Sequence, residues 1–139
     1  MRKIQDIKNT LIFLFIIIYD QVTKYAAVAN INWQANAGIS FGLFPKIPLW
    51  VFFIAILLMF SFKSLYYEPK NDFAWSLFMA GMLGNLIDRV RLGYVIDWIP
   101  LPFPFVEILF LNIADVALII GFICFILCGF KNSSAEHEI

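Results

Sequence analysis

The chain has few charged residues, one histidine and two cysteines. Only 14% of its 139 residues are charged and the formal net charge is zero, so no basic surface for nucleic acid is expected. His137 lies in the polar tail, and Cys124 and Cys128 sit in an apolar run without zinc-ligand spacing. Zinc and acyl-enzyme routes to hydrolysis therefore lack their parts, and we expect neither a metal nor a cofactor.

Hydrophobic residues dominate the composition. They make up 62% of the chain, and the mean hydropathy is +0.83, whereas a soluble domain is nearer half apolar. We therefore expect one all-α integral membrane domain, residues 1–139. Four apolar runs are close to the ~20 residues that a membrane-crossing helix needs. These predicted spans cover about 7–29, 48–67, 73–91 and 108–130, and a polar tail follows at 131–139.

Basic residues set the expected orientation of these spans. They gather before the first span, around the turn between the second and third, and after the last: Arg2, Lys3, Lys8, Lys63, Lys70 and Lys131. By the positive-inside rule, both termini are then cytoplasmic and the loops near 30–47 and 91–107 face outward. This orientation gathers the unusual polar residues in the outer third of the bilayer.

The two outward loops carry different signals. The segment NAGISFG, residues 36–42, is polar and glycine-rich, which favours a small β-like hairpin near 30–47. Its backbone is suited to pairing with an extended peptide, and an ordinary loop is the alternative. In the segment near 91–107, Pro100, Pro102 and Pro104 forbid a regular helix. An irregular or short interfacial helical loop is expected there.

Two aspartates, Asp97 in GYVIDWIP and Asp115 in LNIADVALIIG, lie in or beside apolar sequence. A carboxyl at bilayer depth costs roughly 2.5–3.5 kcal/mol, which makes each a candidate functional residue. Brought together, two carboxyls can share one proton and act as an acid–base pair. Asn112 stands three residues before Asp115 and is expected on the same helix face. The alternative for Asp97 is a solvated position in a loop. The alternative for Asn112 and Asp115 is a structural role, in which they hydrogen-bond one helix to another.

Two acid–base pairs accompany these aspartates. Asp20 and Lys24 have the spacing of a helical ion pair, with the acid first. Asp88 and Arg89 are adjacent and point in different directions on a helix, so Arg89 is free to bind a carbonyl or a lipid headgroup while Asp88 orients the loop. Structural or lipid-facing roles are expected for both pairs.

Small residues precede the second of these pairs. Ala80 and Gly84 give a small-x-x-x-small face, with Gly81 beside it, and such faces let helices pack closely. The expected helix at 73–91 therefore has a defined contact side.

Together these motifs resemble the lipoprotein signal peptidase family, signal peptidase II, which comprises intramembrane aspartic peptidases of bacterial inner membranes. They occur in the family's order through nearly the whole chain, with Ser40, Trp98 and Leu111 as departures. The matching residues are Asp20 and Lys24 in DQVTK, Asn36 and Gly38 in NAGISFG, Asn85, Asp88 and Arg89 in GNLIDR, Asp97 in YVIDWI, and Asn112 and Asp115 in LNIAD.

The resemblance implies that Asp97 and Asp115 are a catalytic dyad. The residues expected to support the dyad or hold the substrate are Asn36, Gly81, Asn85, Arg89 and Asn112. The implied substrate is a prolipoprotein whose lipobox cysteine carries diacylglycerol, cleaved on the amino side of that cysteine at the outer face of the inner membrane. The expected partners are these substrates and membrane lipids, and the enzyme is expected to be a monomer.

Two other classes of protein are compatible with parts of the pattern. A small proton-coupled transporter also buries acids, but it would place its essential acid near the midplane, reachable from both sides. A non-enzymatic assembly subunit leaves the carboxyl pair unexplained.

Overall fold

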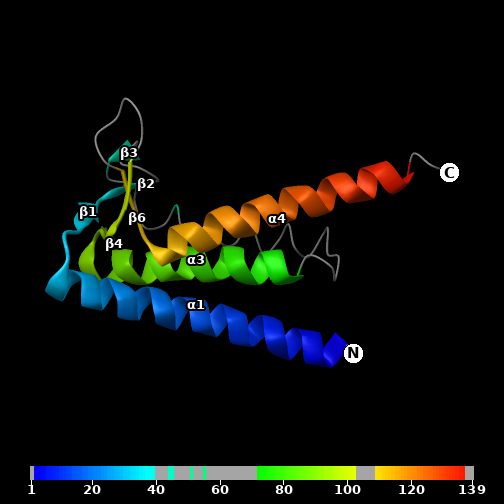
Figure 1. Cartoon of the computed structure of the whole chain (residues 1–139), viewed down its shortest axis with the longest axis horizontal. Coiled ribbons are helices and arrows are strands. Elements are labelled where there is room, and N and C mark those ends of the chain that lie inside the picture. Colours follow the sequence, from blue (N-terminus) through cyan, green and yellow to red (C-terminus); the bar gives the residue numbers. More distant parts are fainter. Residues whose placement is uncertain are drawn as a thin grey trace.

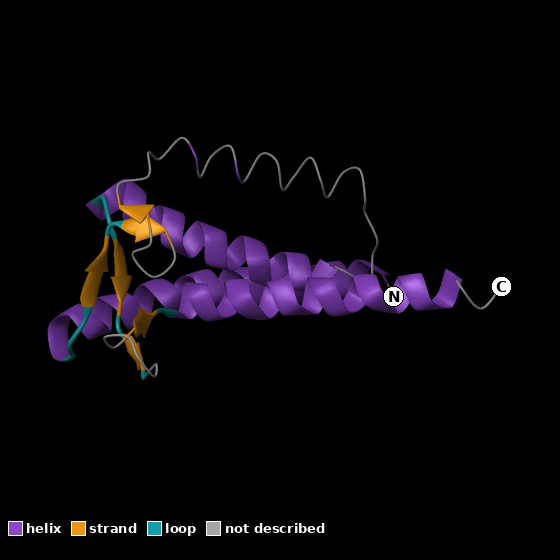
Figure 2. Cartoon of the chain, turned by 90° about the horizontal axis from the view of Figure 1, so that it is seen from above, coloured by secondary structure: helices purple, strands orange, loops and turns teal. Residues whose placement is uncertain are grey.

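The computed structural model describes residues 2–39, 44–45, 51, 55, 72–102 and 109–136. Within them, three long helices lie side by side and short strands gather at one end (Figure 1). Helices α1 (Arg2–Asn30) and α3 (Asp72–Leu92) run toward the strands, and α4 (Ile113–Glu136) runs away from them. Both chain termini therefore lie at the end opposite the strands, as Figure 2 also shows.

The helices agree with the expected spans in part. Helices α1 and α3 cover the segments predicted at 7–29 and 73–91. The span predicted at 48–67 lies outside the described residues, apart from positions 51 and 55. The expected helix start near 108 is wrong, because residues 109–111 form a strand and α4 begins at Ile113. Helix α4 also continues through the predicted tail to Glu136.

The described residues are mostly helical, as expected, but they form more strands than the one small hairpin that was predicted. Strand β1 pairs with β4, β2 with β3, and β5 with β6. The β2–β3 pair is the small hairpin expected near 30–47. The β1–β4 pair joins segments about sixty residues apart and places Asn36 opposite Val95. The strands are β1 (Gln34–Asn36), β2 (Gly38–Ile39), β3 (Phe44–Pro45), β4 (Val95–Asp97), β5 (Ile99–Leu101) and β6 (Leu109–Leu111).

The irregular or helical loop expected near 91–107 is also wrong for the part that is described. Residues 95–101 are almost wholly extended, because β-branched Val95 and Ile96 favour strands and find a partner in β1. Pro100 fits the β5–β6 ribbon opposite Phe110, since a proline is tolerated at the edge of a sheet.

Small residues let α3 pack closely between α1 and α4, as expected (Figure 1). A Cβ added at Gly81 would collide with the carbonyl oxygen of Ala114 and the side chain of Leu118. At Gly84 it would lie 2.9 Å from Asp20 Oδ2 and 3.0 Å from the Ala114 Cβ. Glycine is therefore required at both positions by the closeness of the neighbouring helices.

Apolar side chains cover the outside of the helices. Among the described residues, one helical segment is long and apolar enough to cross a membrane, and it is Lys3–Asn30 of α1. Helix α4 contains a shorter apolar stretch, Ile113–Leu127. The most exposed apolar side chains of α1 include Leu11, Phe15, Ile18 and Val22, and those of α4 include Phe122 and Leu127. Such a surface exceeds what an isolated soluble protein exposes and suits a lipid surrounding.

A buried ion cluster stands where the helices meet the strands. Lys24 Nζ lies 2.8 Å from Asp20 Oδ2 and 2.9 Å from Asp88 Oδ2, and all three side chains are at most 2% exposed. The expected Asp20–Lys24 ion pair is thus present, with Asp88 as a second partner. Gln21 Nε2 donates to both carboxylates, at 3.1 Å each.

The two carboxylates extend the cluster to the other elements. Asp20 Oδ1 accepts a hydrogen bond from the backbone N–H of Ala114 in α4, at 2.8 Å. Asp88 Oδ2 accepts one from the N–H of Ile96 in β4, at 3.3 Å. The ion cluster therefore joins α1, α3, α4 and β4.

Replacing Lys24 tests how much the ion cluster contributes to the stability of the fold. Lys24→Met leaves two carboxylates buried without their cation, which is expected to cost about 3–5 kcal/mol of unfolding free energy. Thermal unfolding of the purified protein in detergent measures this as a lower Tm. Lys8→Met, at an exposed position of the same helix, is the control. Equal Tm values for the two variants would contradict the assigned role.

Candidate active site

Asp97 is a buried strand residue whose carboxylate is held on both sides. It ends β4 and is 2% exposed, so the alternative of a solvated loop residue is wrong. Its Oδ2 accepts a hydrogen bond from Asn36 Nδ2 at 2.9 Å, across the β1–β4 pair. Its Oδ1 accepts one from Asn112 Nδ2 at 2.6 Å. The strand pairing thus sets the position of this carboxyl.

Asp115 is fixed by the start of α4. Asn112 is the residue before the helix, and its Oδ1 accepts a hydrogen bond from the Asp115 N–H at 2.8 Å. In return, Asp115 Oδ2 accepts one from the Asn112 N–H at 3.3 Å. This reciprocal pair has the pattern of a capping box. Asn112 is therefore a helix cap, not a residue on the helix face as predicted.

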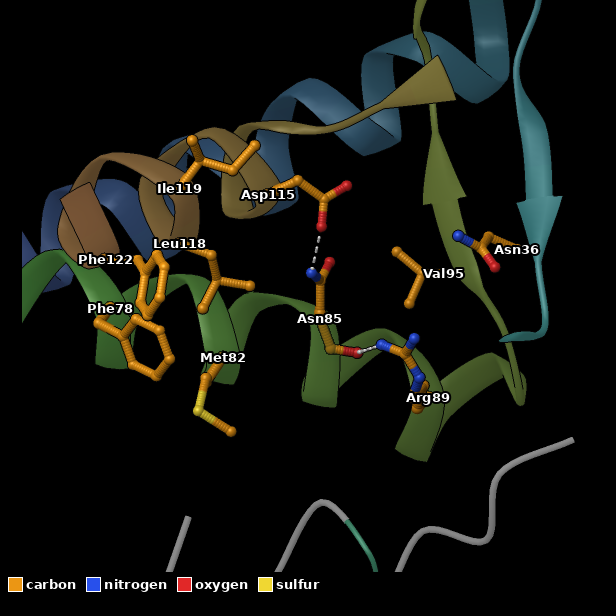
Figure 3. Close-up of a pocket in the computed structure, with 10 residues that line it drawn as sticks. All are labelled: Asn36, Phe78, Met82, Asn85, Arg89, Val95, Asp115, Leu118, Ile119 and Phe122. Atoms are coloured by element: carbon orange, nitrogen blue, oxygen red, sulfur yellow. Dashed lines mark hydrogen bonds between the residues drawn. The ribbon is translucent and has the colours of Figure 1, made fainter. Parts of the chain in front are cut away.

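Asn85 connects the two halves of the site. Its Nδ2 donates to Asp115 Oδ1 at 2.8 Å, drawn as a dashed line in Figure 3. Its Oδ1 accepts from Asn112 Nδ2 and from Lys24 Nζ, both at 3.1 Å. Because a lysine ammonium only donates, it fixes which end of the amide faces Asp115. The four side chains of Asp97, Asn112, Asn85 and Asp115 form one continuous chain of contacts.

Arg89 binds backbone carbonyls beside this chain. Its Nη2 donates to the Gly38 carbonyl oxygen at 2.8 Å and its Nη1 to that of Asn85 at 3.3 Å. Of the two roles expected for Arg89, the structure shows the carbonyl contact. The N–H of Gly38 donates to Asn36 Oδ1 at 3.0 Å, so both residues shape the turn after β1.

The surroundings of Asp97 favour its protonated form. Burial and, after it, the negative charge of Asp115 raise the pKa of Asp97 to about 6, against the lowering effect of hydrogen bonds from Asn36 and Asn112 and of the charge of Lys24. A carboxyl with this pKa can hold or release a proton near neutral pH, which an acid–base pair requires.

A cavity of about 420 Å³ opens beside Asp115 between α3 and α4 (Figure 3). We call it the site cavity. One end is polar and the rest is apolar, so it suits a ligand with a polar reacting group and a hydrophobic extension. The polar end is formed by Asn36, Asn85, Arg89 and Asp115, and the apolar part by Phe78, Met82, Val95, Leu118, Ile119 and Phe122.

The structure separates the expected site residues into two groups. Asn36, Asn85, Arg89 and Asn112 lie in or beside the chain that holds the two aspartates. Gly81 does not line the site cavity and lies against Ala114 and Leu118 of α4, so its expected role at the substrate stays a prediction. Among the described residues, no cluster of three His, Cys, Asp or Glu side chains could hold a metal ion.

Sequence reasoning missed Gln21 and the apolar wall of the site cavity. Gln21 is hydrogen-bonded to both carboxylates of the ion cluster, and its position directly after Asp20 was the available signal. The apolar wall had no signal, because Phe78 and Met82 resemble every other hydrophobic residue of their helix.

Known proteins share this sequence and fold. The sequence profile of the family described as Signal peptidase (SPase) II matches residues 12–131. The lipoprotein signal peptidase of Thermodesulfovibrio yellowstonii is 33% identical over 140 residues, covering 89% of this chain and 95% of that protein. A Staphylococcus aureus lipoprotein signal peptidase is 33% identical over 150 residues, covering 94% and 92%.

Solved structures agree with these sequence matches. A bacterial membrane enzyme determined at 2.3 Å resolution has a TM-score of 0.75 and 32% identity, covering 93% of this chain and 91% of its own. A second, at 1.9 Å, has a TM-score of 0.71 at 32% identity, covering 89% and 93%. The chain therefore belongs to the signal peptidase II family of aspartic peptidases, bacterial membrane enzymes that remove signal peptides from prolipoproteins.

Proposed function

We propose that Asp97 and Asp115 are the catalytic dyad of this peptidase, and that it cleaves diacylglyceryl-modified prolipoproteins on the amino side of the lipidated cysteine. The observation that carries the proposal is the position of Asn112 between the two carboxyls. Its side-chain amide reaches Asp97 Oδ1 at 2.6 Å, and its backbone N–H reaches Asp115 Oδ2 at 3.3 Å. One residue thus contacts both carboxyls, and Asp115 lies at the polar end of the site cavity.

The chemistry follows from two carboxyls in different protonation states. The ionised one takes a proton from water, whose oxygen forms a bond to the scissile carbonyl carbon. The protonated one donates to the carbonyl oxygen, and the leaving amine receives a proton as the C–N bond breaks. Burial and mutual repulsion keep one carboxyl neutral, and the pair titrates as a unit.

The amides and the guanidinium have positioning roles in this mechanism. Asn36, Asn85 and Asn112 hold the carboxylates through hydrogen bonds of 2.6–2.9 Å to their side chains. Arg89 occupies the polar end of the site cavity, where it can bind a backbone carbonyl of the substrate as it binds that of Gly38. Asp20, Lys24 and Asp88 are structural.

The apolar part of the site cavity provides a place for the acyl chains of the substrate. Phe78, Met82 and Phe122 line it from α3 and α4, next to the exposed apolar surface of α4. A diacylated peptide would enter from the bilayer, with its scissile bond at Asp115.

The same arrangement supports an orientation in the bacterial inner membrane. Four spans, including the one predicted at 48–67, cross the bilayer with both termini cytoplasmic and the strands at the outer face. Two observations support this topology: both termini lie at the same end of the molecule (Figure 1), and the first helix begins with basic residues. A monomer is the simplest state in which this proposal works, since one chain supplies both carboxyls.

Substituting each aspartate tests the dyad. Asp97→Asn and Asp115→Asn keep the shape of the side chain and remove its proton chemistry, so each should lower the cleavage rate by about 10²–10⁴-fold. The assay uses the reconstituted protein and a synthetic diacylated prolipoprotein peptide. Asp6→Asn, an exposed acid on α1, is the control. Wild-type cleavage by either dyad variant would exclude that aspartate.

The raised pKa of Asp97 predicts how stability changes with pH. The folded protein retains this proton up to about pH 6, whereas the unfolded carboxyl releases it near its ordinary pKa of 3.8. The folded state therefore binds more protons between these values, and this carboxyl lowers the free energy of unfolding as pH rises through them. Relative to Asp97→Asn, the wild-type Tm should fall between about pH 4 and about pH 6. A constant difference across that range would show that burial does not perturb Asp97.

Narrowing the site cavity tests the place of the acyl chains. Ile119 lines it and Ile120 does not, although both are 44% exposed on α4. Ile119→Trp should raise KM for the diacylated peptide by about tenfold or more, since a misfit of methylene size already has that effect. Ile120→Trp is the matched control. Equal KM values in the two variants would place the acyl chains elsewhere.

A further inference from the structure

A second cavity, of about 210 Å³, lies at the strand end of the molecule. It is formed by the last turns of α1 and α3 together with β4, and we call it the aromatic cavity. Arg91 lines it, whereas Arg89 lines the site cavity. Two residues along a helix differ by about 200° in direction, so the two arginines face opposite sides of α3. The aromatic cavity is therefore separate from the proposed catalytic centre.

The side chains of Lys24, Asp88 and Arg91 give the lining of the aromatic cavity one positive charge, and the carboxylate of Asp20, which shares the Lys24 ammonium but does not line the cavity, balances it. Lys24 and Asp88 both reach its lining, but their ammonium and carboxylate are paired at 2.9 Å. Arg91 is exposed and donates a hydrogen bond to Gln21 Oε1 at 3.3 Å. Within the described part of the chain, no carboxylate lies within ion-pair distance of its guanidinium. The exposed guanidinium of Arg91 is thus the group in this cavity that can donate hydrogen bonds to an anionic ligand.

Aromatic rings form the wall beside this cation. The rings of Trp33 and Tyr94 are stacked, with centroids 6.1 Å apart and an interplanar angle of 13°. Tyr25 adds a third ring and is 81% exposed. Tryptophan and tyrosine are enriched where a protein meets the membrane–water interface, since each ring has an apolar body and a polar atom. The wall is suited to the glycerol region of a lipid.

We propose that the aromatic cavity binds the phosphate headgroup of a membrane phospholipid. The proposal rests on the orientation proposed above, in which the strand end lies at the outer face of the inner membrane. Arg91 forms paired hydrogen bonds to the phosphate oxygens, because its planar guanidinium matches their geometry. The stacked rings of Trp33 and Tyr94 pack against the glycerol.

The apolar surface below the cavity selects a lipid over a free phosphate. Val28 and Leu92 belong to the lining and are 47% and 38% exposed. On α1, Val22 and Ile18 continue this exposed apolar surface away from the strand end, at 58% and 61%. Acyl chains attached to a phosphate at Arg91 would lie along these side chains. A bound phospholipid would therefore hold this end of the protein at headgroup depth without entering the site cavity.

Native mass spectrometry of the full-length protein in detergent tests the proposal. Phosphatidylglycerol is titrated, beside diacylglycerol, which lacks the phosphate, and glycerol 3-phosphate, which lacks the chains. Wild type should retain phosphatidylglycerol in preference to either. Arg91→Gln should weaken this binding by about tenfold or more, as expected for the loss of hydrogen bonds to a charged group. Lys8→Gln, which removes an exposed charge from the opposite end of α1, should bind as wild type does.

Two further variants separate this site from the catalytic one. Trp33→Leu should also weaken phosphatidylglycerol binding, whereas Asp97→Asn should leave this binding unchanged while it lowers the cleavage rate. Wild-type binding by Arg91→Gln would overturn the proposal. Equal binding of glycerol 3-phosphate and phosphatidylglycerol would show that the cavity binds a phosphate without recognising a lipid, which also contradicts the proposal. Wild-type cleavage of the peptide by Asp97→Asn or Asp115→Asn would instead count against the proposed dyad, and it would not affect the conclusion from lipid binding.

Discussion

The ammonium group of Lys24 connects the packing of the fold to the geometry of the site. Its Nζ lies within 3.1 Å of three oxygen acceptors, on Asp20, Asp88 and Asn85. A lysine has three N–H donors, so the group is fully used. Two of these partners join the helices to one another and to β4, and the third sets the direction of the Asn85 amide. Because buried charges are stable only when completely paired, the helices can adopt few other arrangements that keep this group satisfied.

Asparagines, rather than charged residues, donate the side-chain hydrogen bonds to Asp97 and Asp115, the two carboxyls proposed to be catalytic. An amide donates a hydrogen bond without adding a formal charge, so it orients a carboxylate while leaving the proton on the pair free to move. A lysine or arginine in the same place would stabilise both ionised forms and work against proton sharing. Asn85 separates Lys24 from Asp115 in this way: the cation touches the amide oxygen, and the amide nitrogen touches the carboxylate.

The sequence was sufficient to predict two of the helices, one ion pair and the family of the protein. Helices at 7–29 and 73–91 follow from apolar length, and the Asp20–Lys24 pair follows from helical spacing. The pairing of β1 with β4 was not predictable, because strands of three residues have no periodic signal and their partners lie far apart in the chain. For the same reason, the sequence alone places Asp97 in a loop and begins the last helix near 108 instead of at Ile113. Pro100 is not in a regular helix, as predicted, but a proline does not exclude an edge strand.

The capping of α4 by Asn112 makes the site sensitive to chain length at one point and tolerant at another. Each residue inserted between Asn112 and Asp115 would turn the carboxyl by about 100° around the helix axis, away from Asn85. Residues added between β5 and β6 would leave that angle unchanged, because the strands and the cap fix the direction in which α4 starts. The length of this connection can therefore change without moving the Asp115 carboxyl, whereas the four residues from cap to carboxyl must stay constant in number.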